Sequence, residues 1–142
     1  MQVTVNRILE KKGHEVWSVA PDASVFNALE IMADKNTGAV LVRDKETIVG
    51  ILSERDYARK GRCSQDTRVS EVMTRKVTCI GPGSTGDECL ALMTTDRIRH
   101  LPVVKEGKLI GLVSIGDVVK AVIGSRGVLI DQLERYIMGT PA

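Results

Sequence analysis

The sequence predicts an α/β fold in which one β-α-β-β-α unit occurs twice with pseudo-two-fold symmetry, with an extra helix at each end of the chain. Two features carry this prediction. Residues 16–56 align with residues 77–117 without a gap, and their identical and apolar positions coincide. Within each copy, short valine- and isoleucine-rich segments are interspersed with segments of helical apolar spacing. Because a repeated unit of this kind usually cannot bury its apolar face alone, the two copies are expected to pack together.

Each copy has the same order of elements, and local signals mark their ends. Ser24 and Thr85 occupy matched N-cap positions ahead of the long helices. Pro21 and Pro82 close the opening strands. The predicted elements are strands at 16–19 and 77–80, helices at 25–35 and 86–97, strands at 39–42 and 101–104, hairpin turns at 43–47 and 105–108, and strands at 48–52 and 109–113.

Helices are also predicted at the end of each copy and outside the two copies. The last helix of each copy begins near Ser53 or Ser114, and Gly61 should end the first of them early. The ranges predicted are 4–11 and 129–138 for the flanking helices, and 1–62 and 63–142 for the two copies with those helices included.

Composition argues against several classes of protein. The 142 residues include 20 basic and 18 acidic side chains and only 3% aromatic residues, which argues against nucleic acid as a partner. The apolar runs are too short to span a bilayer, so no membrane partner is expected. The three cysteines lack the spacing of a disulfide framework or a metal site, and a cytoplasmic location is expected. Cys79 and Cys89 are predicted to be core residues, and Cys63 an exposed thiol.

No enzymatic activity is predicted. His14 and His100 are the only histidines, and neither falls in a hydrolase motif. The chain also lacks a P-loop, an HExxH sequence and a nucleophile elbow. The sequence therefore favours a binding protein without a catalytic residue.

The junction between the last strand and the last helix of each copy carries the most informative motif. It has the form G-h-h-S-x-x-D at Gly50–Asp56 and again at Gly111–Asp117, where h is an apolar residue. A carboxylate at a helix start can accept hydrogen bonds from the two hydroxyls of a ribose, and the serine and first-turn amides can donate to a phosphate. The same residues can instead form an ordinary helix N-cap. Both interpretations stay open from the residues alone.

A basic cluster precedes the second predicted strand of the second copy, and the first copy has no counterpart of it. Arg97, Arg99 and His100 stand there, whereas Gly38 is the counterpart of Arg99 in the first copy. Arginine and histidine donors suit phosphate oxygens. Basic residues at a helix end also complement the helix dipole, which is the alternative interpretation. Arg55 places a further basic group beside the first junction.

The duplicated unit and its G-h-h-S-x-x-D junctions resemble the cystathionine-β-synthase (CBS) domain pair. The resemblance covers nearly the whole chain and is closest to small stand-alone bacterial CBS-pair proteins of the signal-transduction type. Three stretches carry it, at 15–19, 53–60 and 97–103. It implies a regulatory module that binds an adenosyl compound such as AMP, ADP, ATP or NAD(H) in clefts between the two copies. No cofactor is required beyond that regulatory ligand.

The resemblance also implies roles for individual residues. Asp56 and Asp117 would hold ribose hydroxyls, while the two junction serines would contact ribose or phosphate. Arg99 and His100 would meet phosphate, and the opening strands would enclose the adenine. The residues expected to contact the ligand are Ser53, Arg55, Asp56, Arg99, His100, Ser114, Asp117, Val16, Val19, Val77, Ile80 and Gly38.

The resemblance implies a homodimer that acts on an unknown downstream protein. An alternative function is a protein-interaction module whose clefts stay empty. Its support is the apolar stripe of the predicted C-terminal helix, at Leu129, Leu133, Tyr136 and Ile137. Such a stripe is more often docked on a second copy of its own chain.

Overall fold

The computed structural model describes residues 3–60 and 65–124 and divides into two compact units. One unit is Glu15–Thr78, and the other combines Met1–His14 with Cys79–Ala142. This division differs from the linear ranges 1–62 and 63–142. The reason is that the N-terminal segment packs on the second copy, while the segment that leads into the second copy packs on the first.

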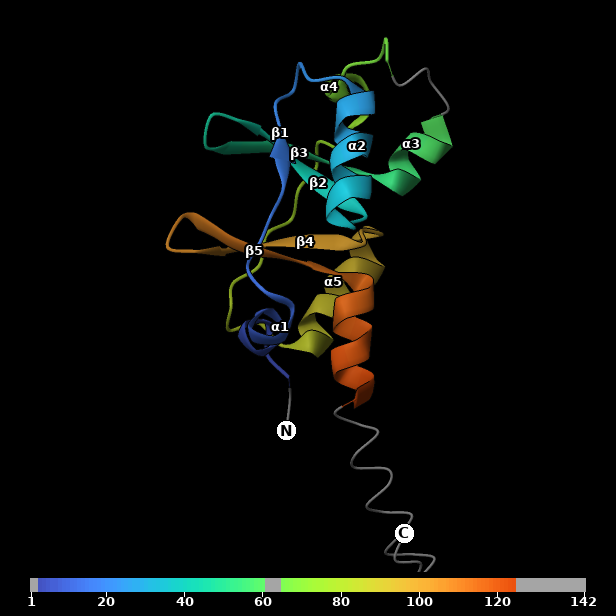
Figure 1. Cartoon of the computed structure of the whole chain (residues 1–142). Helices are drawn as coiled ribbons and strands as arrows, with labels where there is room; N and C mark the ends of the chain where they lie inside the picture. Colours follow the sequence, from blue (N-terminus) through green and yellow to red (C-terminus); the bar gives the residue numbers. More distant parts are fainter. Residues whose placement is uncertain (1–2, 61–64, 125–142) are drawn as a thin grey trace, which may run out of the picture. The chain divides into compact units, whose positions relative to one another are not determined.

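The Glu15–Thr78 unit contains a three-stranded sheet with helices (Figure 1). Its sheet has the order β1-β2-β3, in which β1 is parallel to β2 and β2 is antiparallel to β3. Ser24 caps the long helix by accepting a hydrogen bond from the Asn27 amide, and Asn36 ends that helix in the left-handed conformation. The elements are β1 Ser18–Val19, α2 Val25–Lys35, β2 Ala39–Asp44, β3 Thr47–Ser53, α3 Glu54–Lys60 and α4 Val69–Val72.

The core of this unit depends on residues that follow α4. Met73 is buried against Gly50 of β3, where a Cβ atom would lie 2.5 Å from the Met73 sulfur and 2.9 Å from the Thr74 carbonyl oxygen. Thr74 and Ile51 exchange two backbone hydrogen bonds of 2.9 and 3.0 Å. Glycine at position 50 therefore lets the segment after α4 lie directly on β3.

The second unit repeats this arrangement with an N-terminal helix (Figure 1). The helix that begins after the Thr4 cap places the buried Leu9 over Gly111, where a Cβ atom would lie 2.7 Å from a Leu9 methyl group. Ile80 forms a single parallel bridge to Val103. The elements are α1 Val5–Lys12, α5 Gly86–Asp96, β4 His100–Lys105, β5 Lys108–Ser114 and a helix at 115–124.

Several predicted elements differ from the structure in length. The strand predicted at 16–19 is two residues long, and the one predicted at 77–80 is reduced to the Ile80 bridge. Both are edge segments that pair on one side only, which explains their shortness. The predicted early end near Gly61 and the helix predicted at 129–138 involve residues that the structure does not describe.

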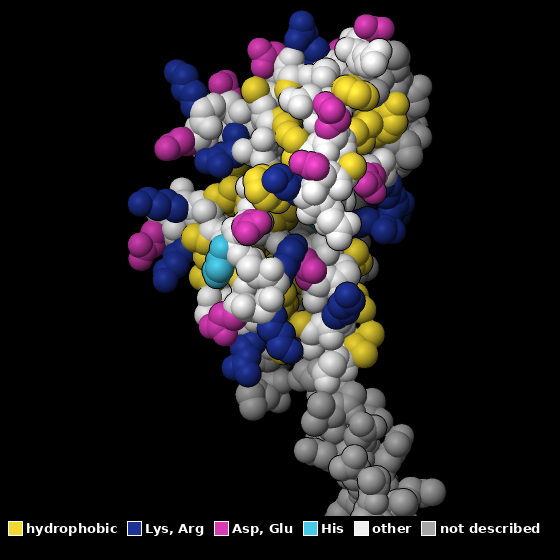
Figure 2. All heavy atoms as spheres, in the orientation of Figure 1, with side chains coloured by type: hydrophobic (Ala, Val, Ile, Leu, Met, Phe, Trp, Pro, Cys, Tyr) yellow, Lys and Arg dark blue, Asp and Glu magenta, His cyan; other side chains and the backbone are white. Residues whose placement is uncertain are grey.

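Two of the three cysteines, Cys79 and Cys89, lie in the described part of the chain. Cys89 is buried as predicted. Cys79 was predicted to be a core residue but is exposed, because successive side chains of an extended segment point to opposite faces and the neighbouring Ile80 is the buried one. Burial, together with the neighbouring Glu88 carboxylate, raises the pKa of Cys89 to about 11, so its thiol stays protonated at neutral pH. Cys63 lies outside the described residues. Acidic and basic side chains are interspersed on the face shown in Figure 2.

Candidate functional site

The first junction is a helix cap built by two residues that hold each other. Ser53 Oγ accepts a hydrogen bond of 3.1 Å from the Asp56 amide, and Asp56 Oδ2 accepts one of 3.2 Å from the Ser53 amide. This is a reciprocal capping box with aspartate in place of the usual glutamate. The capping interpretation of the motif is thereby confirmed. The cap uses only one of the two carboxylate oxygens of Asp56, so it does not conflict with the ribose interpretation. That interpretation stays a prediction.

A residue from outside the aligned repeat completes this junction. The Thr74 hydroxyl donates a hydrogen bond of 3.3 Å to Asp56 Oδ2 and is held in place by the pairing of Thr74 with Ile51. Asp56 is half-buried, and its Oδ1 atom has no hydrogen-bond partner within the described part of the chain. The junction therefore presents one fixed carboxylate oxygen that is still able to accept a hydrogen bond.

The second junction has the same cap with a different third partner. Ser114 Oγ accepts a hydrogen bond of 3.1 Å from the Asp117 amide, and Asp117 Oδ2 accepts one of 2.8 Å from the Ser114 amide. Here the third donor is charged. Lys12 Nζ lies 2.5 Å from Asp117 Oδ2 and 2.7 Å from the Leu112 carbonyl oxygen.

The lysine fixes the charge state of Asp117. Burial alone would raise the pKa of Asp117, but hydrogen bonds from Lys12 and Ser114, together with the Lys12 charge, lower this pKa overall. Side-chain exposures of 35% for Lys12 and 26% for Asp117 make this a partly buried ion pair. At neutral pH Asp117 is therefore ionised, and the Lys12 ammonium balances its negative charge.

Two of the predicted ligand contacts lie beside the junctions of their own units. The Glu54 amide donates to the Gly38 carbonyl oxygen at 3.1 Å, and the Ile115 amide donates to the Arg99 carbonyl oxygen at 2.8 Å. Gly38 is exposed, with no atom within 4 Å of a Cβ built on it. Each junction is therefore joined by its backbone to the residue that precedes the neighbouring strand.

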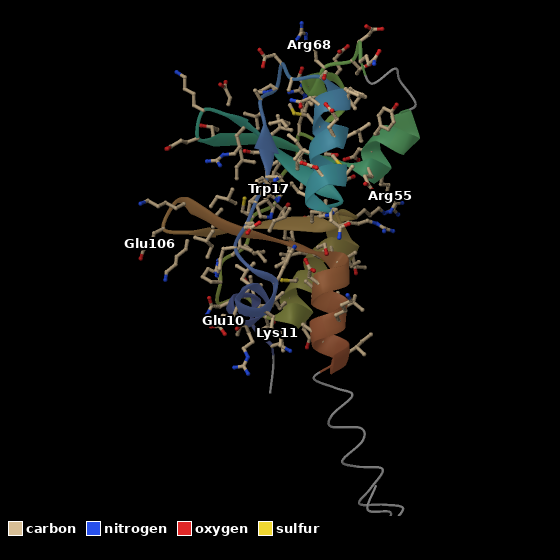
Figure 3. All side chains as sticks on the ribbon, viewed as in Figure 1. Glu10, Lys11, Trp17, Arg55, Arg68 and Glu106 are labelled. Carbon is tan, nitrogen blue, oxygen red and sulfur yellow. The ribbon has the colours of Figure 1, made fainter. Side chains whose placement is uncertain are left out.

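The remaining predicted contacts are distributed between the two units. Arg99 is exposed and His100, the first residue of β4, is half-buried. Arg55 is an exposed residue of α3, labelled in Figure 3. Because Arg55 and Asp56 belong to one unit and Arg99 and His100 to the other, their combined use stays a prediction.

The apolar residues predicted to enclose a base contribute mainly to the cores of the two units. Val19 and Ile80 are each 8% exposed and belong to the buried clusters of their units. Val16 and Val77 are half-buried. Trp17, which also packs on its unit's core, is covered by the Lys35 ammonium 4.7 Å from the ring centroid. A role of this backbone in binding adenine stays a prediction.

The sequence patterns did not predict Lys12 and Thr74, the residues that distinguish the two junctions. Both lie outside the segments 16–56 and 77–117, to which the alignment is confined. A second alignment would have found the elements that carry them, because Val5, Ile8 and Leu9 have the same spacing as Val69, Val72 and Met73.

Within the described ranges, no group of three or more histidine, cysteine or acidic side chains could hold a metal ion. No helix in those ranges has the length and apolar character that crossing a membrane requires.

Comparisons with known proteins agree on one family. The family model described as "CBS domain" matches the chain twice, at residues 8–61 and 69–124. A curated relative, the mitochondrial CBS domain-containing protein CBSX3 of Arabidopsis thaliana, is 36% identical over 150 residues, which cover 96% of this chain and 72% of the relative. These matches include both junctions.

Solved structures give the same result. The crystal structure of the CBS domain protein NE2398 is 50% identical, with a TM-score of 0.80 and coverage of 85% of this chain and 98% of that chain. The CBS domain pair of protein MJ0100 was solved in complex with 5-methylthioadenosine and S-adenosyl-L-methionine. It is 22% identical with a TM-score of 0.76, covers 88% of this chain and 99% of that chain, and shows a shared fold.

Proposed function

Since the chain belongs to the CBS-domain family, we propose that it is a regulatory module that binds an adenine nucleotide (AMP, ADP, ATP or NAD(H)) and signals to a partner protein. The observation that carries this proposal is the half-buried Asp56 carboxylate. Its Oδ2 atom is fixed by Ser53 and Thr74, and its Oδ1 atom has no hydrogen-bond partner among the described residues.

The geometry suits a ribose. A ribose has two adjacent hydroxyls, and a carboxylate can accept a hydrogen bond from each of them. The capping box fixes the rotamer of Asp56 before any ligand arrives, so less conformational entropy is lost on binding. The exposed Gly38 leaves room for a ligand beside the same junction.

Basic residues supply the proposed phosphate contacts. Arg55 lies next to Asp56 in α3. Arg99 immediately precedes β4, and His100 is the first residue of that strand. Guanidinium groups bind phosphate oxygens with charge-assisted hydrogen bonds. The adenosyl ligands of the MJ0100 domain pair support the adenosine part of the proposal, and the basic residues support the phosphate part.

The proposed signal is a population shift. A nucleotide that binds one arrangement of the protein more tightly raises the population of that arrangement. An affinity near 10 μM corresponds to about −7 kcal/mol, which is enough to bias two states if their affinities differ. We place this module in the cytoplasm as a homodimer, without a catalytic role.

Isothermal titration calorimetry with AMP, ATP and NADH tests the proposal. The wild-type protein should bind one of these, and Asp56→Asn should weaken binding by about tenfold or more, because a hydrogen bond to a charged group is lost. Asp34→Asn, an exposed residue of α2, is the matched control. Absence of heat with every adenosyl ligand would contradict the proposal.

A protein-interaction module is the second candidate function. Phe26 of α2 is 42% exposed and Ile123 of the helix at 115–124 is 63% exposed, so each unit has a large apolar side chain that a second chain could cover. If Ile123→Glu converts a dimer to a monomer while no adenosyl ligand binds, this second function is favoured.

A further inference from the structure

The two junctions are built alike but differ in the group that contacts the aspartate. In the first unit that group is the neutral Thr74 hydroxyl, 3.3 Å from Asp56 Oδ2. In the second unit it is the Lys12 ammonium, 2.5 Å from Asp117 Oδ2. Each contact is made between residues of its own compact unit.

The difference changes what each junction can offer to a sugar hydroxyl. A threonine hydroxyl both donates and accepts, so it can turn its proton away from Asp56 and accept a hydrogen bond from a ligand. An ammonium group only donates. In both junctions the hydrogen bonds described above end on Oδ2 of the aspartate, so the difference lies in the third partner. The first junction has acceptors on Asp56 and on Thr74, whereas at the second the Lys12 charge neutralises Asp117 and makes its carboxylate a weaker acceptor for a ribose hydroxyl.

Lys12 is also well anchored in its position. Its ammonium group donates to the Leu112 carbonyl oxygen as well as to Asp117, at 2.7 Å. Two residues further on, His14 Nδ1 lies 2.9 Å from the Ile110 carbonyl oxygen, so the end of α1 is fixed to β5 at two points. Lys12 stands in the last turn of α1, where its charge also complements the helix dipole.

We infer that this protein binds one nucleoside ribose per chain, at Asp56, and that Lys12 excludes the ligand from Asp117. This inference rests on the proposed function and makes it specific. The Lys12 ammonium takes the place of a ribose hydroxyl as the hydrogen-bond donor to Asp117. The second junction therefore attaches α1 to its unit and does not bind a ligand. The ligand class is a nucleoside or nucleotide with both ribose hydroxyls free.

The stoichiometry of binding, measured by calorimetry with AMP, ATP and NADH, tests the inference first. Wild-type protein should bind one equivalent per chain, Asp56→Asn should weaken binding about tenfold or more, and Asp117→Asn should leave affinity within about twofold. Two equivalents, or loss of binding in Asp117→Asn alone, would overturn the inference and leave the proposed function intact. Absence of binding in the wild type would overturn both.

Removing the lysine tests its role directly. Lys12→Met keeps the length of the side chain and removes its charge, and it should raise the stoichiometry to two equivalents per chain. Lys11→Met is the matched control, since Lys11 is an exposed residue of the same helix (Figure 3), and it should bind one equivalent. If folded Lys12→Met, verified by circular dichroism, still binds one equivalent, Lys12 does not exclude the ligand. The two aspartate variants test the site assignment even if Lys12→Met fails to fold.

Discussion

The Asp56 and Asp117 junctions have the same cap and different third partners. Each serine and aspartate pair closes a helix start with hydrogen bonds between 2.8 and 3.2 Å. At Asp56 the extra donor is the Thr74 hydroxyl, and at Asp117 it is the Lys12 ammonium. The comparison teaches that a duplicated motif keeps its structural role in both copies, while residues outside the motif decide what each copy can bind.

The largest effect is expected from the residue that covers Gly111. Leu9 is fully buried in α1, and Leu9→Ala should destabilise the protein by about 3 kcal/mol, because it leaves a cavity over β5. Met73→Ala is the matched change over Gly50 and should cost a similar amount. Urea denaturation gives both values. A cost below about 1 kcal/mol for Leu9→Ala would show that α1 contributes little to its unit.

The two glycines beneath these side chains should respond unequally to a methyl group. At Gly50 a Cβ atom meets the Thr74 backbone oxygen at 2.9 Å as well as the Met73 sulfur, whereas at Gly111 the three nearest atoms all belong to the Leu9 side chain, which can shift more easily than backbone. Gly50→Ala should therefore cost about 2–3 kcal/mol and Gly111→Ala about 1 kcal/mol by denaturant unfolding. Gly38→Ala, which meets nothing within 4 Å, is the control. Equal costs at the two positions would contradict this reasoning.

Lowering the pH should weaken the ion pair of the second junction, and its effect on stability should be smaller than that of the substitutions above. The pKa of Asp117 is lower in the folded protein than in the unfolded chain. The stabilisation by ionised Asp117 is therefore complete at pH values above the pKa of this aspartate in the unfolded chain. It is lost as the pH falls through the pKa of Asp117 in the folded protein. For a partly exposed pair the effect is below about 1 kcal/mol. Thermal unfolding between pH 7 and pH 3 should show a smaller stability loss in Lys12→Met than in wild type. An identical pH profile would mean that the ion pair contributes nothing to stability.

The smallest effect concerns the hairpin turns. Lys45 and Glu106 have φ values of 59° and 52°, in the left-handed region that asparagine tolerates better than either residue. Lys45→Asn and Glu106→Asn should each raise stability by about 0.5 kcal/mol, measurable as a small rise in melting temperature. A decrease in either variant would indicate that the original side chain makes a stabilising contact.

The sequence predicted most helices and central strands because their signals are local. The helix predicted at 25–35 has the same bounds as α2, since Ser24 caps one end and the left-handed Asn36 ends the other. The Ser53 and Asp56 pairing also follows from spacing alone. Short edge segments such as 77–80 were predicted too long, because their extent depends on pairing with distant residues.

The exchange of flanking segments between the copies could not be predicted in this way. The residues of α1 carry no local signal that Leu9 packs on Gly111, which lies far along the chain. Lys12 and Thr74 reach the junctions only because of this exchange, so the difference between the two junctions was outside the reach of sequence patterns.

The exchanged helices also determine how the protein can be divided. A cut near residue 62 would give two fragments, each carrying the piece that fills the other's sheet, with Leu9 in the first fragment and Met73 in the second. Neither fragment would hold a complete core, and the two should reassemble when mixed. A single repeat is therefore better cut near residues 14 and 78, where the first unit keeps Met73 and its whole buried cluster on one continuous segment. The second core, in contrast, needs the distant helix α1 as well as the residues from Cys79 onward.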